Sequence, residues 1–312
     1  MAYLKIKDLK VHFPIKGGIF GRTVDYVKAV DGVSFSLEKG MTYGLIGESG
    51  SGKTTTGRAI IGLNKITSGE IYFNGKNITN DRRRKGSFRK DVQMIFQDPY
   101  SSLNPRKRVY DILQEPLRNF EKLSKEEEEN RIIELLELVG LSKENIYKYP
   151  HQFSGGQRQR IGIARAIATK PKLIIADEPV SALDVSVQAQ VLNFLQEIQQ
   201  ELDLTYIFIG HDLGVIRHLC DRIGIMYKGR FVEEGDTEDI FNNPQHIYTK
   251  KLISSIPDIN PRNRQERYVI RAEVEQEYEE NYDHYFDNQG LAYPLQPVTN
   301  THLVALPQKE EF

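Results

Sequence analysis

The chain has 312 residues, 39% of them hydrophobic and 27% charged, and its 42 Lys and Arg against 43 Asp and Glu give a formal net charge of −1. This balance argues against a general polyanion binder, because nucleic-acid modules usually carry a basic surplus. The one cysteine, Cys220, excludes an internal disulfide and a cysteine-based metal cluster, and it favours a reducing compartment. We expect no signal peptide and no membrane span, because no apolar run approaches about eighteen residues.

The N-terminal part of the chain predicts strands followed by a phosphate site. Short strands are predicted at 4–7 and 32–37, with a loop at 14–22 between them. An apolar run at 43–46 leads through a glycine- and serine-rich loop into a helical pattern at 54–63. Strand, glycine loop and helix follow one another in the order that a phosphate site requires.

The glycine-rich loop matches the phosphate-loop (P-loop) pattern G-x-x-x-x-G-K-[ST]. The predicted ATP-contacting residues are Gly47, Glu48, Ser49, Gly50, Ser51, Gly52, Lys53 and Thr54, together with Thr55. The glycines let backbone N–H groups turn toward phosphate oxygens, Lys53 reaches the β- and γ-phosphates, and the Thr54 hydroxyl can ligate Mg²⁺. A dinucleotide fingerprint fits less well, because Thr55 stands where a third glycine or alanine is needed.

The middle of the chain turns from strand to helix. Strand patterns return at 70–73 and 92–96. The basic segment at 82–90 is either a solvated helical face or a contact with lipid headgroups or a partner. From about 100 to 170 the pattern is helical, with a capping box formed by Ser124 and Glu127, and Gly140 can end that helix.

Alternating strands and helices resume from 172 to 235, which indicates a parallel sheet covered on both faces. The predicted elements are strands at 173–176 and 205–209, helices near 186–202 and 213–220, and a hairpin through 223–233. The first of these strands ends in two acids, Asp177 and Glu178. Asp177 would hold Mg²⁺, and Glu178 would orient the water that attacks the γ-phosphate.

Further segments resemble a known family. Residues 153–160 read Phe-Ser-Gly-Gly-Gln-Arg-Gln-Arg, so a serine and two glycines open a helix and offer N–H groups to an anion. This segment resembles the signature sequence of ABC ATPases, with Phe153 in place of the usual leucine. The other matches are Gln97 to the family's Q-loop, Asp184 to its D-loop and His211 to its switch histidine.

The resemblance implies a role for each matched residue. Gln97, Glu178 and His211 would be catalytic. The Mg²⁺ ligands would be Thr54, Gln97 and Asp177. Ser154, Gly155, Gly156, Gln157 and Asp184 would complete the ATP pocket of a partner subunit, so the protein would work as a dimer. The aromatic residue stacking on adenine would be Phe13, with Tyr26 as its rival.

Longer runs resemble the ATP-binding subunits of oligopeptide and dipeptide importers. They lie at 97–106, 149–160, 176–190 and 244–252. Gln157 and the run 179–181 are similar to the F-type subunit rather than to its D-type sister. The chain has Ile247 where proline is usual, and it lacks the cysteine-rich iron–sulfur segment of some relatives.

The implied fold is an α/β ABC ATPase cassette over about 3–258. It would combine a P-loop core with a mostly parallel sheet, an N-terminal antiparallel β subdomain and an α-helical subdomain at about 100–170. Residues 259–312 would form a C-terminal extension, in which 273–287 hold seven acidic residues and no Lys or Arg. A tail this acidic is poor at building its own core, although its aromatic residues could dock it. Truncation after about Asn260 is expected to spare ATP binding and to alter assembly or coupling.

The implied function is binding and hydrolysis of ATP to energise oligopeptide uptake from the cytoplasmic face of the membrane, as a peripheral protein. The implied partners are a D-type sister ATPase in a heterodimer, two transmembrane permeases and, indirectly, an extracellular peptide-binding protein, with no nucleic acid. The alternatives are an importer ATPase for dipeptides, nickel or other small solutes, and a soluble ABC ATPase acting on DNA or ribosomes. A non-hydrolysing regulatory cassette is disfavoured by Glu178 and His211.

Overall fold

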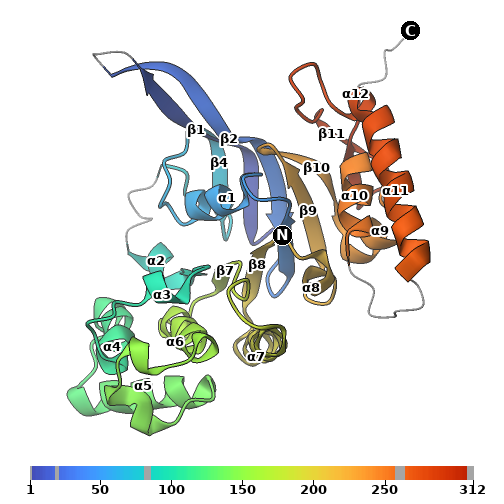
Figure 1. The fold of residues 1–312 in the computed structure, drawn as a ribbon. Helices are drawn as coiled ribbons and strands as arrows, with labels where there is room; N and C mark the ends of the chain where they lie inside the picture. The colour runs from blue at the N-terminus through green and yellow to red at the C-terminus, as the bar shows by residue number, and fades with distance from the viewer. Residues whose placement is uncertain (1, 18–20, 81–85, 257–263, 308–312) are drawn as a thin grey trace. The chain divides into compact units, whose positions relative to one another are not determined.

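The computed structural model describes residues 2–17, 21–80, 86–256 and 264–307. The chain divides into two compact units, one made of Met1–Asn80 with Phe208–Phe312 and the other of Asp81–Ile207 (Figure 1). Residues 82–85 of the basic segment predicted at 82–90 lie outside the described residues.

The first unit opens with an antiparallel sheet of strand order β2-β1-β4-β5. These strands are β1 (Leu4–Gly17), β2 (Arg22–Leu37), β4 (Ser68–Phe73) and β5 (Lys76–Asn77). Leu4 pairs with Leu37 on one side and Phe73 on the other, and all three side chains are buried. Apolar residues at alternate positions of β1 therefore build the core of this sheet, as its period of two requires.

The loop predicted at 14–22 is too long at both ends, because Arg22 already begins β2. The β1 strand runs on to Gly17, and Pro14 pairs with Tyr26 in the β1–β2 ladder. A proline is tolerated here because β4 accompanies β1 only as far as Lys10, so the later part of β1 has a strand on one side only.

A second sheet in the same unit holds the P-loop strand. Its strands in order are β11 (Leu295–Pro297), β12 (Leu303–Ala305), β10 (Arg230–Asp236), β9 (Arg222–Tyr227) and β3 (Thr42–Ile46). β3 runs parallel to β9, whereas the β9–β10 pair is the predicted hairpin. All five residues of β3 are buried, which accounts for its continuous apolar character.

The helices of the first unit follow its strands. They are α1 (Lys53–Ile60), α8 (Leu213–Arg217), α9 (Thr237–Asn242), α10 (Ile247–Ser254), α11 (Arg264–Glu280) and α12 (Tyr282–Tyr285). The helix predicted at 213–220 is shorter than expected, because the His218 N–H bonds to the Val215 carbonyl in a tight final turn.

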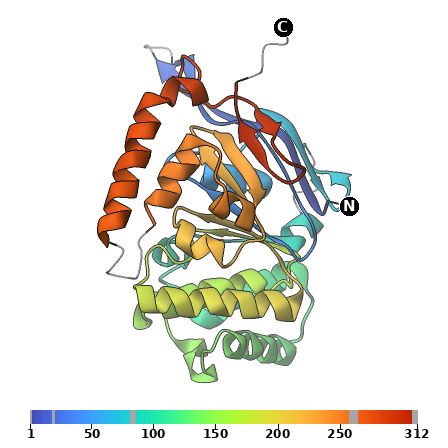
Figure 2. The ribbon, with the colours of Figure 1, turned by 90° about the vertical axis from the view of Figure 1, so that its right-hand side faces the viewer.

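The acidic C-terminal segment packs onto the first unit. Helix α11 lies alongside α10 (Figure 2), where Lys250 and Lys251 form ion pairs of 2.7 and 2.6 Å with Glu277 and Glu275. Phe286, just after α12, is 1% exposed. The prediction that aromatic residues could dock this tail is therefore confirmed.

The second unit contains the predicted helical region. Its elements are α2 (Ser87–Asp91), β6 (Val92–Ile95), α3 (Pro99–Ser102), α4 (Val109–Phe120), α5 (Lys125–Leu138), two short 3-10 turns (Lys143–Tyr147 and Pro150–Gln152), α6 (Gly155–Ile167), β7 (Leu173–Asp177) and α7 (Val185–Leu202). β6 and β7 are parallel. Ser124 and Glu127 form the expected capping box on α5, and Gly140 follows its end with φ +67°. Strand β8 (Thr205–Gly210) carries the chain back to the first unit.

Over the residues that the structure describes, no helix combines the length and apolar character that crossing a bilayer requires.

Candidate functional site

The P-loop joins β3 to α1 in the first unit, and its glycines occupy positions that admit no side chain. Gly47 has φ +151°, and a Cβ there would collide with the Met226 carbonyl oxygen at the end of β9. Gly52 has φ +107°, and a Cβ there would collide with the Ala29 carbonyl oxygen on β2. The flanking strands thus press the loop into a form that only glycine can adopt.

Lys53 lies in the interior of this loop. Its side-chain nitrogen donates hydrogen bonds of 2.7 Å to the carbonyl oxygens of Gly47 and Glu48 and one of 3.4 Å to the Ser51 hydroxyl. Because Gly52 is the N-cap of α1, no side chain of the cap residue satisfies the first amides of that helix. The loop therefore combines a buried ammonium group with a positively polarised helix N-terminus, and these groups fit the phosphates of ATP.

The turn between β9 and β10 and the helix α10 also contact the P-loop. Gly229 N–H donates to the Ser51 carbonyl at 2.9 Å, and Glu48 N–H donates to the Tyr248 hydroxyl at 3.2 Å. Sequence motifs predict neither contact, because neither Gly229 nor Tyr248 belongs to a recognised nucleotide motif.

Strand ends in the second unit bring Gln97 and Glu178 together. Gln97 lies two residues after β6 and Glu178 directly after β7, and the Gln97 side-chain amide donates to a Glu178 carboxylate oxygen at 2.8 Å. Asp177, the last residue of β7, is buried. Because the carboxyl ends of parallel strands meet at one edge of a sheet, β6 and β7 place an amide and two carboxylates close together. Such oxygen ligands suit Mg²⁺.

Glu178 has a backbone conformation unusual for its residue type. Its φ is +45°, in the left-handed region that costs free energy for a residue with a Cβ. Ser181 donates two hydrogen bonds to the Glu178 carbonyl, 3.3 Å from its N–H and 3.2 Å from its hydroxyl. This turn ends β7 and directs the chain into the D-loop.

The signature residues open α6 as the sequence predicted. Ser154 is the N-cap, its hydroxyl accepting from Gln157 N–H at 3.3 Å while the Gln157 side chain accepts from Ser154 N–H at 3.1 Å. A Cβ on Gly156 would lie 2.5 Å from a Val187 methyl group on α7, whereas one on Gly155 would make an ordinary contact. Gly156 thus has a packing role that was not anticipated.

The D-loop is tied to the start of α7. Gln188 donates from its side-chain amide to the carbonyls of Val180 and Leu183, at 3.1 and 3.0 Å. Asp184 is the N-cap of α7, but its exposed carboxylate makes no capping hydrogen bond. The Asp184 carboxylate therefore lies on the surface of this unit.

The remaining predicted residues belong to the first unit. His211 is exposed in the turn after β8, next to Asp212, which caps α8 by accepting from Gly214 N–H at 2.9 Å. Phe13 is 41% exposed and Tyr26 52% exposed. Phe13 pairs with Val27 and Pro14 with Tyr26, so the two rings lie on opposite faces of the hairpin.

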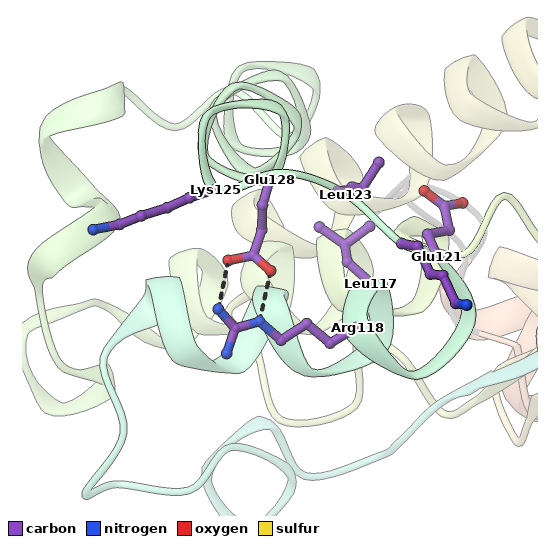
Figure 3. Close-up of a pocket in the computed structure, with 7 residues that line it drawn as sticks. Leu117, Arg118, Glu121, Leu123, Lys125 and Glu128 are labelled. Atoms are coloured by element: carbon purple, nitrogen blue, oxygen red, sulfur yellow. Dashed lines mark hydrogen bonds and ion pairs between the residues drawn. The ribbon is translucent and has the colours of Figure 1, made fainter.

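A pocket of about 200 Å³ lies between α4 and α5 in the second unit (Figure 3). Its lining consists of Leu117, Arg118, Glu121, Lys122, Leu123, Lys125 and Glu128. Arg118 donates from Nε to the buried Glu128 carboxylate at 2.7 Å, which braces the two helices. None of the residues predicted for the nucleotide site lines this pocket.

Comparisons with known proteins agree with this geometry. A family model described as "ABC transporter" matches residues 30–181, and one described as "Oligopeptide/dipeptide transporter, C-terminal region" matches residues 232–283. The oligopeptide transport ATP-binding protein OppF of Lactococcus lactis is 54% identical over 99% of this chain and 97% of its own length. The dipeptide transport ATP-binding protein DppF of Escherichia coli is 49% identical over 87% and 81%, respectively.

Solved structures show the same fold. A dimeric ATP-binding cassette in a post-hydrolysis state, bound to ADP and Pi, matches with a TM-score of 0.66 and 29% identity over 75% of this chain and 98% of its own. CbiO1 from Clostridium perfringens, part of an ABC transporter complex, matches with a TM-score of 0.68 and 26% identity over 86% and 98%.

Proposed function

Since the chain belongs to the ATP-binding subunits of the ABC oligopeptide and dipeptide transporter family, we propose that it hydrolyses ATP to energise the uptake of oligopeptides. The observation that carries the catalytic part of this proposal is the 2.8 Å hydrogen bond between Gln97 and Glu178 at the ends of β6 and β7. It holds a carboxylate in a fixed orientation beside Asp177, as positioning of an attacking water requires.

On the phosphate side, Lys53 and the first amides of α1 would bind the β- and γ-phosphates, and His211 would contact the γ-phosphate. Mg²⁺ would be held by Thr54, Gln97 and Asp177, and when bound it neutralises charge on the phosphate oxygens. Glu178 would orient the water and accept its proton, while Gln97 keeps the Glu178 carboxylate in place. The adenine ring would stack on Phe13 or Tyr26. Because these two rings lie on opposite faces of the hairpin, one of them and not both would stack on the adenine.

The signature and D-loop residues would act on a partner's nucleotide. Ser154 is already engaged in capping α6, so the amides of Gly155 and Gly156 and the dipole of that helix are the groups left to offer an anion. With the exposed Asp184 they would complete the ATP site of a D-type sister subunit. Residues 3–258 would form this nucleotide-binding domain, with its helical subdomain at about 100–170, and 259–312 the C-terminal extension.

The two ATPase subunits would lie at the cytoplasmic face of the membrane as peripheral proteins bound to two transmembrane permeases. The helical region near 97–108 would pass their closure on to the permeases. An extracellular binding protein would deliver the peptide, which would not touch this chain.

Peptide uptake in the host tests this function. Deletion of the chain should abolish uptake of a labelled oligopeptide, and wild-type protein should restore it whereas Lys53→Ala should not. Uptake of a free amino acid serves as the control and should not change. Oligopeptide uptake that survives the deletion would contradict the proposal, and loss of dipeptide uptake alone would reassign the substrate to dipeptides, as in the DppF relatives.

A further inference from the structure

The hydroxyl group of Tyr248 lies against the backbone of the P-loop. Tyr248 is on α10, its side chain is 1% exposed, and its hydroxyl accepts the Glu48 N–H at 3.2 Å. Glu48 is the second residue of the loop, directly after the constrained Gly47. A residue far outside the nucleotide motifs therefore fixes the direction of a P-loop amide.

The ring of Tyr248 joins the P-loop to the β9–β10 turn. Its centroid lies 4.8 Å from that of Tyr227, the last residue of β9. Two residues further on, Gly229 holds the Ser51 carbonyl of the P-loop at 2.9 Å. The start and the middle of the loop are thus held by one connected group of residues.

The C-terminal segment packs against the same turn. Phe286 packs on Tyr227 with their ring centroids 4.8 Å apart, and the hydroxyls of Tyr227 and Tyr282 lie 3.4 Å apart. Lys228 donates to the Gly290 carbonyl at 3.3 Å, and Arg230 to that of Ala292 at 3.0 Å. Residues 282–292 therefore contact three of the four residues from Tyr227 to Arg230.

We propose that Tyr248 is a positioning residue of the nucleotide site and that the C-terminal residues contacting the β9–β10 turn, namely Tyr282, Phe286, Gly290 and Ala292, set the affinity of the P-loop for phosphate. The inference rests on the proposed function, because it concerns the same ATP site. It assigns the C-terminal segment a task in nucleotide binding, whereas the sequence alone suggested that truncation after Asn260 would spare it.

The physical reason is the flexibility of a glycine-rich loop. Glycine loses more backbone entropy on ordering than any other residue, so a free P-loop would pay that cost each time it binds phosphate. Hydrogen bonds to Glu48 and Ser51 order the loop before the ligand arrives. Burial, together with the nearby Glu48 charge, raises the pKa of Tyr248, so the phenol stays protonated at physiological pH and the contact does not switch with pH.

The test compares Tyr248→Phe with wild type in the full chain, using MgATP and MgADP as probes in calorimetric titrations. The variant keeps the aromatic packing and removes one hydrogen bond, so the Kd should rise about fivefold for both nucleotides. The two should change alike because the P-loop cradles phosphates that they share. In the assembled transporter, KM for ATP should rise while kcat at saturating ATP stays the same.

Tyr285→Phe is the matched control. Tyr285 belongs to the same aromatic cluster, but its hydroxyl contacts the Gln245 carbonyl at 3.5 Å rather than the P-loop. Both variants should melt within a degree or so of wild type, and only Tyr248→Phe should change the Kd. Phe286→Leu, which loosens the packing on Tyr227, should raise the Kd for both MgATP and MgADP.

The possible outcomes separate the inference from the function beneath it. If wild type binds MgATP, Lys53→Ala does not, and Tyr248→Phe binds as wild type does, the inference is overturned and the proposed function stands. An effect of Tyr285→Phe equal to that of Tyr248→Phe would also overturn it, because general loosening would then explain both. If wild type binds no MgATP, the proposed function and the inference fall together.

Discussion

Lys53 is a charged residue in the interior of the first unit and is only 4% exposed. A buried ammonium group is tolerated only when hydrogen-bonded, and here two carbonyls of the P-loop and a serine hydroxyl accept its protons. The same charge attracts phosphate, so Lys53 both orders the loop and binds the ligand.

Lys53→Ala should raise the Kd for MgATP about tenfold or more, because it removes a charge-assisted contact to phosphate and leaves the Gly47 and Glu48 carbonyls without their donor. Calorimetric titration of the purified chain measures the change. Lys76→Ala on the exposed strand β5 is the control, and we expect it to bind as wild type does. Equal affinities in all three proteins would show that Lys53 does not contact the nucleotide.

At this scale the sequence was informative where chemistry is local. The P-loop pattern identified Lys53 and the acidic strand end identified Glu178. The family resemblance supplied Gln97, which the structure joins to Glu178 by a hydrogen bond. The role of Tyr248 was not predictable, because it lies 200 positions from its partner Glu48 and no sequence pattern links the two residues.

At the scale of elements, the α6–α7 contact explains why the signature contains a second glycine. The sequence interpretation assigned Gly156 to anion binding, but its position against Val187 shows a packing requirement as well. The sequence predicted α7 close to its observed bounds and a helix opening at the signature, yet the distance between the surfaces of α6 and α7 depends on tertiary packing that a pattern of apolar residues does not encode.

Gly156→Ala should destabilise the protein by about 1–3 kcal/mol, because the added methyl group overpacks the contact with Val187. Gly162→Ala on the same helix, where a Cβ would meet nothing within 4 Å, should be neutral or stabilising by up to about 1 kcal/mol. Denaturant unfolding measures both. Adding Val187→Ala should recover much of the loss in Gly156→Ala, and a double variant no more stable than the sum of its single changes would refute the steric explanation.

The α4–α5 pair contains a buried carboxylate whose effect on stability depends on pH. Burial alone would raise the pKa of Glu128, but hydrogen bonds from Arg118, Gln114 and Tyr110 outweigh it and leave that pKa below its ordinary value. A lowered folded-state pKa gives stability that is complete above the unfolded value of about 4.3 and is lost as the pH falls through the folded value.

Glu128→Gln should therefore lower Tm by a few degrees at pH 7, and the gap to wild type should narrow as the pH falls below about 4. Thermal unfolding at the two pH values checks this. Glu134→Gln on the exposed side of α5 should leave Tm unchanged at both. A gap of the same size at pH 7 and at low pH would exclude the ionised Glu128 carboxylate as its source.

At the scale of the whole molecule, the fold class was predictable because motifs, apolar strands and helical stripes agree with one another. The packing of the C-terminal segment was harder to predict. Its acidic composition suggested poor packing, whereas α11 pairs its glutamates with lysines of α10 and Phe286 is buried among aromatic rings. These contacts join segments that are distant in the sequence, and amino-acid composition does not show which residues pair with one another.

In the proposed mechanism each chain is half of an ATPase, in which Glu178 orients the attacking water and the signature residues serve a partner. The most direct measurement is the rate of MgATP hydrolysis by the assembled transporter in which this chain carries Glu178→Gln. The substitution keeps the shape of the side chain and removes the charge that accepts a proton. We predict that MgATP still binds and holds the dimer closed, while turnover falls on the order of 10²-fold or more. Undiminished turnover would contradict the account.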